Sequence, residues 1–383
     1  MLKKILLTLL VFLCLAAIIL IATGHSYIIT AMQRTYLQGE VTANINDHTA
    51  FNTNLIKTDS PQELPVSESN YQADLPDTFR SYHEAIGTAA YVVVKDGEII
   101  SEHYMNGYDA RSKTNAFSMA KTVVTLLVGI AIEEGYLESL EQKLTDFLPE
   151  FINDPLAANA TIGQLSSMTS GYEWTEHYYS PFSPTVELLY GDDVEGFLLS
   201  GYFSAEPGSS YEYSSASTQL LGIILKRALR EKGNTQTISE YLSEKIWQPL
   251  QMNDDALWHT DEKNMELVFC CISSNARNFA KLGMLMLQQG KWQNQQIVTN
   301  EFIQLITTPT PTSFYGYSTW INYQSEPNYF WFSGHLGQYI IAIPEHNMVI
   351  VRLGEQRESD TDFRTNDIPY LIDTALTLGK IKT

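Results

Sequence analysis

The sequence predicts an α+β fold in which an antiparallel sheet is flanked by helices and accompanied by a second, mainly helical lobe. Strand-like apolar runs lie near both ends of residues 79–383, and helical segments lie between them. The pair Asp96-Gly97 separates the first two runs and is a strong signal for a β-hairpin. Strands from both ends that share one sheet, with helices packed on it, make a multi-layered αβ arrangement.

The first hairpin strand covers residues 89–94 and the second begins at Ile99. Four later strands are expected over residues 315–323, 329–332, 339–343 and 348–353. A long helix is expected after Asn115, through Ser118, to about Glu134, where Gly135 ends it. Further helices are expected over residues 220–230, 238–247, 275–289 and 368–378. The helical lobe then spans about residues 136–264, and the cleft between lobe and sheet is the expected place for a site.

Composition narrows the classes of function. Of the 383 residues, 44% are hydrophobic and 18% charged, which is the balance of a globular protein. The formal net charge of −20 argues against a nucleic-acid partner, because phosphate binding needs a basic surface. No Cys/His cluster has the spacing of zinc ligands, so we expect neither a metal nor a cofactor. The three cysteines predict no disulfide framework, since the neighbours Cys270 and Cys271 rarely bridge.

The amino terminus carries a targeting signal. Two lysines precede an almost unbroken apolar run from Ile5 to Ala22, close to the length of a membrane-spanning helix. Residues 1–27 are therefore a signal anchor or, alternatively, a cleaved signal peptide. Residues 28–78 are polar and proline-containing, typical of a spacer or an irregular extension that wraps the domain. We expect the protein in the cell envelope, membrane-anchored, with residues 79–383 outside the cytoplasm (periplasmic or extracellular).

Ser118 and Lys121 are the first candidate catalytic pair. Positions i and i+3 lie on one face of a helix, so the amine can reach the hydroxyl. A serine needs a base beside it to become a nucleophile, and a lysine whose pKa is lowered by desolvation can serve. The start of the helix also supplies N–H groups for a developing oxyanion. Alone the pair is weak, because Ser-x-x-Lys arises about once by chance in a chain of this length.

Two later segments add polar groups that a cleft could use. In residues 207–216, a Pro-Gly turn leads to Tyr213 and Ser215, which can present a phenol and a hydroxyl. Tyr213 could relay a proton, acting as a base if Lys121 depresses its pKa. Between two strand-like runs, the segment 333–338 places His335 toward the site and offers the N–H of Gln338 as an oxyanion donor. A packed tyrosine and a structural histidine are the plain alternatives.

Taken together, these segments resemble the class C β-lactamase-related serine hydrolases, over about residues 79–383. That family includes penicillin-binding DD-peptidases, class C β-lactamases, esterases and 6-aminohexanoate-dimer hydrolases. The resemblance rests on three motifs in the family's order, namely Phe117-Ser118-Met119-Ala120-Lys121, Tyr213-Ser214-Ser215 and His335-Leu336-Gly337. It extends to Thr161–Leu165 with Met168–Tyr172 and to Asn275–Gly283, which resembles the family's late helix. It implies a β-lactamase/DD-peptidase-like fold and an acyl-enzyme formed on Ser118.

Two departures from the family pattern bear on the substrate. Ser215 stands where the family's second motif typically has asparagine, and His335 stands where β-lactamases have the lysine that helps hold a substrate carboxylate. Both replacements are similar to the esterase and 6-aminohexanoate-dimer hydrolase branches. The Tyr- and Trp-rich stretch 172–184, with Trp174 and Tyr178, would shape the cleft mouth. Gly337 completes the third motif.

The sequence therefore predicts a serine hydrolase that cleaves an ester, a small amide or a peptide-like substrate. Ser118 is the nucleophile, and Lys121 and Tyr213 handle protons. Ser215, His335, Gly337, Gln338, Trp174 and Tyr178 bind the substrate or the oxyanion. Two alternatives remain open: a DD-peptidase or β-lactamase, and a non-catalytic envelope binding protein with the same fold. No Gly-x-Ser-x-Gly occurs, so an α/β-hydrolase nucleophile elbow is not available.

Overall fold

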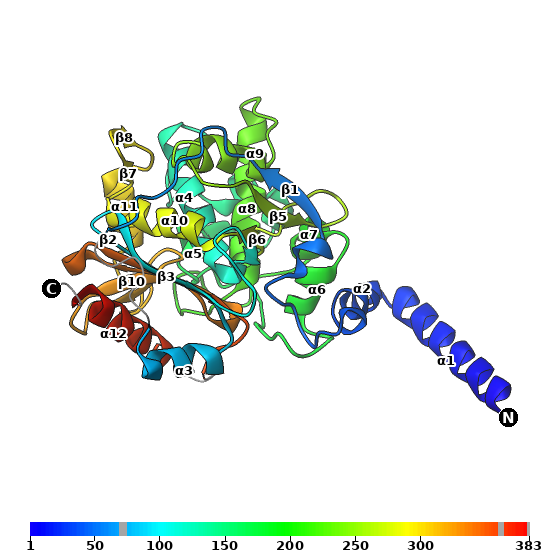
Figure 1. Ribbon diagram of the computed structural model, residues 1–383. Coiled ribbons are helices and arrows are strands. Elements are labelled where there is room, and N and C mark those ends of the chain that lie inside the picture. Colours follow the sequence, from blue (N-terminus) through cyan, green and yellow to red (C-terminus); the bar gives the residue numbers. More distant parts are fainter. Residues whose placement is uncertain (69–74, 359–363, 381–383) are drawn as a thin grey trace.

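A six-stranded antiparallel sheet has the strand order β3-β2-β12-β11-β10-β9. It lies on the side of the molecule opposite the projecting amino-terminal helix (Figure 1). Its strands are β2 Thr88–Lys95, β3 Glu98–Tyr104, β9 Trp320–Asn322, β10 Tyr329–Gly334, β11 Gln338–Ile343 and β12 Met348–Gly354. The computed structural model describes residues 1–68, 75–358 and 364–380. It confirms the predicted sheet, in which the amino-terminal hairpin β2–β3 pairs with the carboxy-terminal strand β12.

The central strands are buried along nearly their whole length because both faces of the sheet are covered. In β2, Val92 and Val94 point into one hydrophobic core, and Tyr91 and Val93 point into a second core on the opposite face. The first core includes helices α4 (Ala120–Glu133) and α10 (Ala276–Leu287). The second is covered by α3 (Asp77–Ala85) and α12 (Asp367–Lys380) (Figure 1). A side-chain period of two therefore fills two cores at once.

A second sheet was not predicted. Its strand order is β1-β5-β6-β4, and its members are β1 Asn52–Ile56, β5 Ala256–Thr260, β6 Ile272–Ser274 and β4 Thr114–Asn115. The edge strand β1 and helix α2 (Ser26–Arg34) both lie in or next to the segment that we expected to be an irregular spacer. In β1 only Ile56 is buried, so its sequence carries no alternating apolar signal. A small hairpin, β7 Lys291–Trp292 with β8 Gln295–Gln296, stands apart.

The helical lobe contains one long helix, α8 (Ser215–Glu231), and several short ones. The short helices are α5 Ile162–Ser166, α6 Pro184–Tyr190, α7 Val194–Leu199 and α9 Ile238–Leu242. Helix α8 begins five residues before the predicted start at 220, because the Ser214 hydroxyl caps it by accepting a hydrogen bond from the N–H of Ser217. The earlier start places Ser215 in the first turn of a helix.

Most other predicted elements are present with altered bounds. The predicted strand 315–323 is correct only for β9. Tyr315 forms only isolated bridges, and the chain bends at Ser318, which has a positive φ of 52°. The predicted helix 238–247 divides into α9 and a π-helical turn over Ser243–Trp247. The predicted helices 275–289 and 368–378 correspond to α10 and α12. Helix α11 (Asn300–Ile306) was not predicted.

Helix α1 (Leu2–Ala22) projects away from the rest of the molecule (Figure 1). It has 21 residues, a mean hydropathy of 3.3 in its most apolar window, and no buried residue. Its length and composition suit a membrane span, and a signal sequence has the same properties.

Candidate functional site

Ser118 lies in a 3₁₀ turn, Phe117–Met119, directly before α4, rather than inside one continuous helix as predicted. The turn is possible because Phe117 adopts a left-handed conformation with φ of 46°, which is uncommon for a large side chain. The Phe117 N–H donates to Asn115 Oδ1 at 2.8 Å, and Asn115 Nδ2 donates to Asp47 Oδ1 at 3.0 Å. Burial raises the pKa of Asp47 to about 7. The amino-terminal extension thus supports the backbone of the nucleophile.

Lys121, one turn after Ser118, is in contact with three oxygen atoms. Its Nζ lies 3.2 Å from Ser118 Oγ, 3.1 Å from Ser215 Oγ and 2.8 Å from the carbonyl oxygen of Phe269. The side chain is 1% exposed. Burial lowers the pKa of Lys121 to about 8, although the charge of Glu176 acts in the opposite direction. A lysine in this position is partly neutral near pH 8 and can accept a proton from Ser118.

Tyr213 joins the same cluster, but not in the ionisation state that we considered for a base. Its ring centroid lies 5.2 Å from Lys121 Nζ, and a hydrogen bond links its hydroxyl to the Ser118 side chain. Burial and the charge of Glu176 raise the pKa of Tyr213, and the bond to Ser118 only partly opposes this. The condition under which Tyr213 could act as a base, a pKa depressed by Lys121, is therefore not met. The phenol stays protonated and can donate a proton.

Glu176 is a site residue that the sequence analysis missed. Its carboxylate accepts four hydrogen bonds: Oε1 from Ser215 Oγ and Tyr178 Oη, both at 2.7 Å, and Oε2 from the Ser215 N–H at 2.8 Å and Trp174 Nε1 at 2.7 Å. Trp174 and Tyr178 were predicted to shape the cleft mouth, and Glu176 lies midway between them. A carboxylate between two aromatic donors is a signal that could have identified it.

The segment His335-Leu336-Gly337-Gln338 contributes the His335 side chain to the site. Gly337 and Gln338 have structural roles next to it. The His335 ring packs against Tyr178, with ring centroids 4.9 Å apart, and edge-on against Phe117 at 5.5 Å. Gly337 has φ of 82°, and a Cβ there would lie 2.5 Å from Nη1 of Arg352, so the position requires glycine. The Gln338 side chain donates to the Gly354 carbonyl at 2.7 Å and accepts from its N–H at 2.9 Å. It therefore ties β11 to β12.

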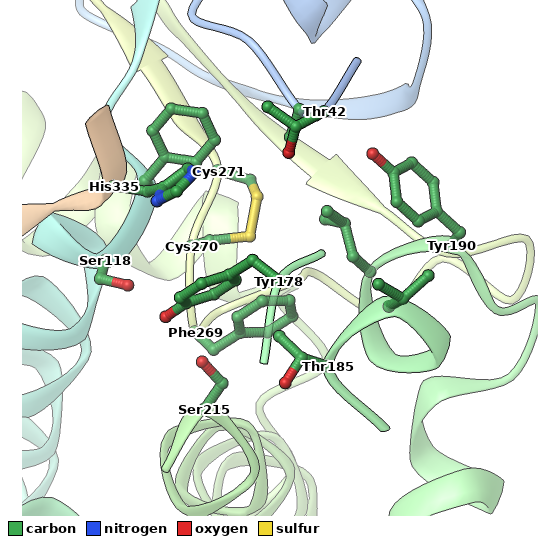
Figure 2. A pocket seen from close by; sticks show the side chains of 14 residues that line it. Thr42, Ser118, Tyr178, Thr185, Tyr190, Ser215, Phe269, Cys270, Cys271 and His335 are labelled. Atoms are coloured by element: carbon green, nitrogen blue, oxygen red, sulfur yellow. A yellow bond between two sulfur atoms is a disulfide. The ribbon is translucent and has the colours of Figure 1, made fainter. Parts of the chain in front are cut away.

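A pocket opens beside Ser118 (Figure 2). Its wall combines nucleophile-side, helical-lobe and extension residues, and these are Thr42, Ala43, Phe117, Ser118, Tyr178, Thr185, Val186, Leu189, Tyr190, Ser215, Phe269, Cys270, Cys271 and His335. The predicted residues Ser118, Ser215, Tyr178 and His335 thus meet at one pocket. Trp174, Gly337 and Gln338 are not among the residues that line it.

The pocket wall also corrects our expectation about the cysteines. Cys270 and Cys271 form a disulfide between adjacent residues, and both line the pocket (Figure 2). Cys271 adopts a left-handed conformation with φ of 75°. The strained geometry of a bridge between neighbouring cysteines argued against it, but here the bridge forms at the end of the turn Leu267–Cys270, in which the Cys270 N–H donates to the Leu267 carbonyl at 3.1 Å. The same turn fixes the Phe269 carbonyl that contacts Lys121.

The chain is similar to known proteins over most of its length. A family model described as Beta-lactamase matches residues 75–372. The 6-aminohexanoate-dimer hydrolase of Paenarthrobacter ureafaciens is 22% identical over 326 residues, covering 79% of this chain and 81% of the relative. A Bacillus anthracis structure, provisionally described as a 6-aminohexanoate-dimer hydrolase, has a TM-score of 0.75 at 23% identity, covering 87% of this chain and 92% of that one. A family VIII carboxylesterase has a TM-score of 0.61 at 17% identity, over 80% and 99%.

Proposed function

The chain belongs to the Beta-lactamase family and is a serine hydrolase, and we propose that it cleaves an ester or a small amide through an acyl-enzyme on Ser118. The observation that carries this proposal is the 3.2 Å contact between Ser118 Oγ and Nζ of a buried lysine. A nucleophile next to a base of lowered pKa is the arrangement that acyl transfer needs.

In the acylation step, Ser118 Oγ attacks the substrate carbonyl and its proton passes to neutral Lys121. The hydroxyl of Tyr213, hydrogen-bonded to the Ser118 side chain, is placed to give a proton to the leaving alcohol or amine. Tyr213 regains a proton from Lys121, so both groups return to their starting states. The N–H groups of Ser118 and Gln338 are the proposed oxyanion donors. Water then attacks the acyl-enzyme, and the protons move in the reverse direction: from water through Tyr213 to Lys121, and from Lys121 back to Ser118 Oγ.

The character of the pocket favours esters and small amides over penicillin-like acids. Its wall is rich in apolar and aromatic side chains, among them Phe117, Leu189 and Phe269. His335 takes the place of the family's carboxylate-binding lysine, and Glu176 lies just behind Ser215. A negative charge there repels a substrate carboxylate. One relative is named for hydrolysing a 6-aminohexanoate dimer and one structural neighbour is named a carboxylesterase, which also supports this preference.

The test uses purified protein and three classes of substrate. We expect hydrolysis of p-nitrophenyl esters, fluorophosphonate labelling that maps to Ser118 by mass spectrometry, and loss of both in Ser118→Ala. A fluorescent penicillin should acylate slowly or not at all, and rapid acylation would favour the DD-peptidase or β-lactamase alternative. No adduct at Ser118 with ester, amide or β-lactam probes would instead favour a non-catalytic binding protein.

The amino-terminal helix bears on where the enzyme works. We propose that α1 anchors the protein in a membrane and that the catalytic domain lies outside the cytoplasm, with Lys3 and Lys4 on the cytoplasmic side. Support comes from the length of α1 and from its lack of any buried residue. Recovery of the full-length protein in the membrane fraction, with a protease-accessible domain on the outer side, would test this.

A further inference from the structure

Glu176 is linked to the catalytic lysine by two hydrogen bonds, because the Ser215 hydroxyl bridges the two side chains. Ser215 Oγ is 2.7 Å from Glu176 Oε1 and 3.1 Å from Lys121 Nζ. Glu176 is not among the residues that line the pocket, whereas Ser215 is. The carboxylate can therefore influence Lys121 without meeting the substrate.

The hydrogen-bond inventory fixes the direction of each proton in this chain. An ionised carboxylate only accepts, so the single hydroxyl proton of Ser215 points to Glu176. Ser215 Oγ then has only lone pairs to offer Lys121. The carbonyl oxygen of Phe269, 2.8 Å from Nζ, is also purely an acceptor. Both of these partners require an N–H from Lys121.

A neutral amine has two N–H groups and one lone pair. When Ser215 and Phe269 take both N–H groups, the lone pair is left for the third contact of Nζ, Ser118 Oγ at 3.2 Å. Without Glu176, the Ser215 hydroxyl could rotate and donate to that lone pair instead. Lys121 would then hydrogen-bond to the wrong serine.

From this geometry we infer that Glu176 is a positioning residue that acts through the Ser215 hydroxyl to aim the lone pair of Lys121 at Ser118. The inference rests on the proposed function, since it explains how the base of that reaction is oriented. It also gives Ser215 a role that the asparagine of the family's second motif could not fill in the same way, because an amide has no rotatable hydroxyl.

Glu176→Gln is the principal variant, because it keeps the side-chain volume and removes the charge. The donors at Oε2 are N–H groups, which cannot accept a hydrogen bond, so the amide oxygen must take that position. The amide –NH2 then faces the Ser215 hydroxyl, which accepts from it and turns its proton elsewhere. We expect the plateau of kcat/KM for a p-nitrophenyl ester to fall about ten- to a hundredfold, the size of a lost hydrogen bond to a charged group. Fluorophosphonate labelling of Ser118 should slow by a similar factor. The matched control is Glu173→Gln, an exposed glutamate on the same loop, which should behave as wild type.

The pH profile separates positioning from a merely structural role. Glu176 raises the pKa of Lys121, so its loss should move the acid limb of kcat/KM to lower pH while the plateau falls. A loosened loop alone would lower the plateau and leave the limb in place. An acid limb that moves while the plateau stays at the wild-type level would show that Glu176 acts only through its charge, and would overturn the inference.

A double-mutant cycle tests the route through Ser215. If Glu176 acts through that hydroxyl, Glu176→Gln combined with Ser215→Ala should be no slower than Ser215→Ala alone. Additive losses would show that Glu176 acts by another path and would overturn the inference. Near-UV circular dichroism and thermal melting report whether each variant is folded. If Glu176→Gln is not folded, Glu176→Asp replaces it, because it keeps the charge and therefore the acid limb of kcat/KM.

An NMR titration keeps this test distinct from that of the proposed function. The pKa of Lys121, followed with ¹³C-labelled lysine and assigned with Lys121→Ala, does not depend on turnover. It should fall in Glu176→Gln and stay unchanged in Glu173→Gln. A wild-type protein that neither hydrolyses nor labels would refute the proposed function, whereas an unchanged Lys121 pKa in Glu176→Gln would refute the role of Glu176.

Discussion

Lys121 and Lys281 are both 1% exposed, and burial lowers the pKa of each to about 8. Lys281, on α10, donates to the carbonyl oxygens of Gln62 and Gln251 at 2.6 and 2.5 Å. Lys121 contacts one carbonyl and two serine hydroxyls. The two lysines share their burial and pKa shift and differ in their partners.

This difference shows that a buried lysine with a lowered pKa does not by itself mark a catalytic base. A carbonyl oxygen only accepts hydrogen bonds, so the carbonyl partners of Lys281 make it a tie between the amino-terminal extension and α10. A hydroxyl can give up its proton, so Ser118 turns the same kind of amine into a base. The chemistry of the site depends on the partner rather than on the shift.

Substituting each lysine gives the largest contrast. Lys121→Ala should lower kcat by about a thousandfold, because it removes the general base. Lys281→Met should leave kcat within about twofold and lower the free energy of unfolding by about 1–3 kcal/mol, because two buried carbonyls lose their donor. Ester hydrolysis and urea unfolding measure the two effects. Comparable losses of activity in both variants would remove the distinction.

The pH dependence should single out Lys121. Below about pH 8 the amine is protonated and cannot take the Ser118 proton, so kcat/KM should fall about tenfold for each pH unit. Lys281→Met should keep the same acid limb, since Lys281 is not part of the reaction. A limb that shifts in Lys281→Met would mean that the wrong lysine has been assigned. Initial rates at saturating and subsaturating ester, measured from pH 6 to 10 at constant ionic strength, provide the profile.

The disulfide belongs to the Lys121 region alone and should matter there. The Cys270–Cys271 bridge directly follows Phe269, whose carbonyl contacts Lys121. Replacing both cysteines with alanine should lower kcat/KM about tenfold, because that carbonyl is less well fixed. Cys14→Ser, which alters the free, exposed cysteine in α1, is the control and should leave the rate unchanged. Wild-type activity in the double alanine variant would show that the disulfide lines the pocket without contributing to catalysis.

The smallest expected effect concerns the pH dependence of stability, to which both lysines contribute. Each has a folded-state pKa of about 8 against an ordinary value of 10.5, so between these values the unfolded chain binds more protons than the folded one. Stability therefore rises with pH across this window. Removing either lysine should flatten that rise, by up to one proton. Urea unfolding at pH 8 and pH 10 measures the slope, and an unchanged slope in Lys281→Met would contradict the burial effect.

Much of the fold follows from local patterns in the sequence. The Asp96-Gly97 hairpin, the apolar strands β10 to β12, and helices α10 and α12 were all predictable, because strand alternation and helix signals are contained in neighbouring residues. The second sheet was not predictable. Its strands have two to five residues and pair over long sequence distances, as in the pairing of Asn52 with Thr260.

The candidate site likewise combines residues that the sequence predicts with groups that only long-range packing brings together. The sequence by itself determined the Ser118–Lys121 pair, because a spacing of three residues on one helical turn fixes their approach wherever the helix lies. Only the tertiary structure brought Glu176, Ser215 and the Phe269 carbonyl to that lysine. A backbone carbonyl has no signature in the sequence, and a glutamate is a base, a support or a surface charge according to what folds against it. The sequence supplied the nucleophile and its amine, and long-range packing decided where the lone pair of that amine points.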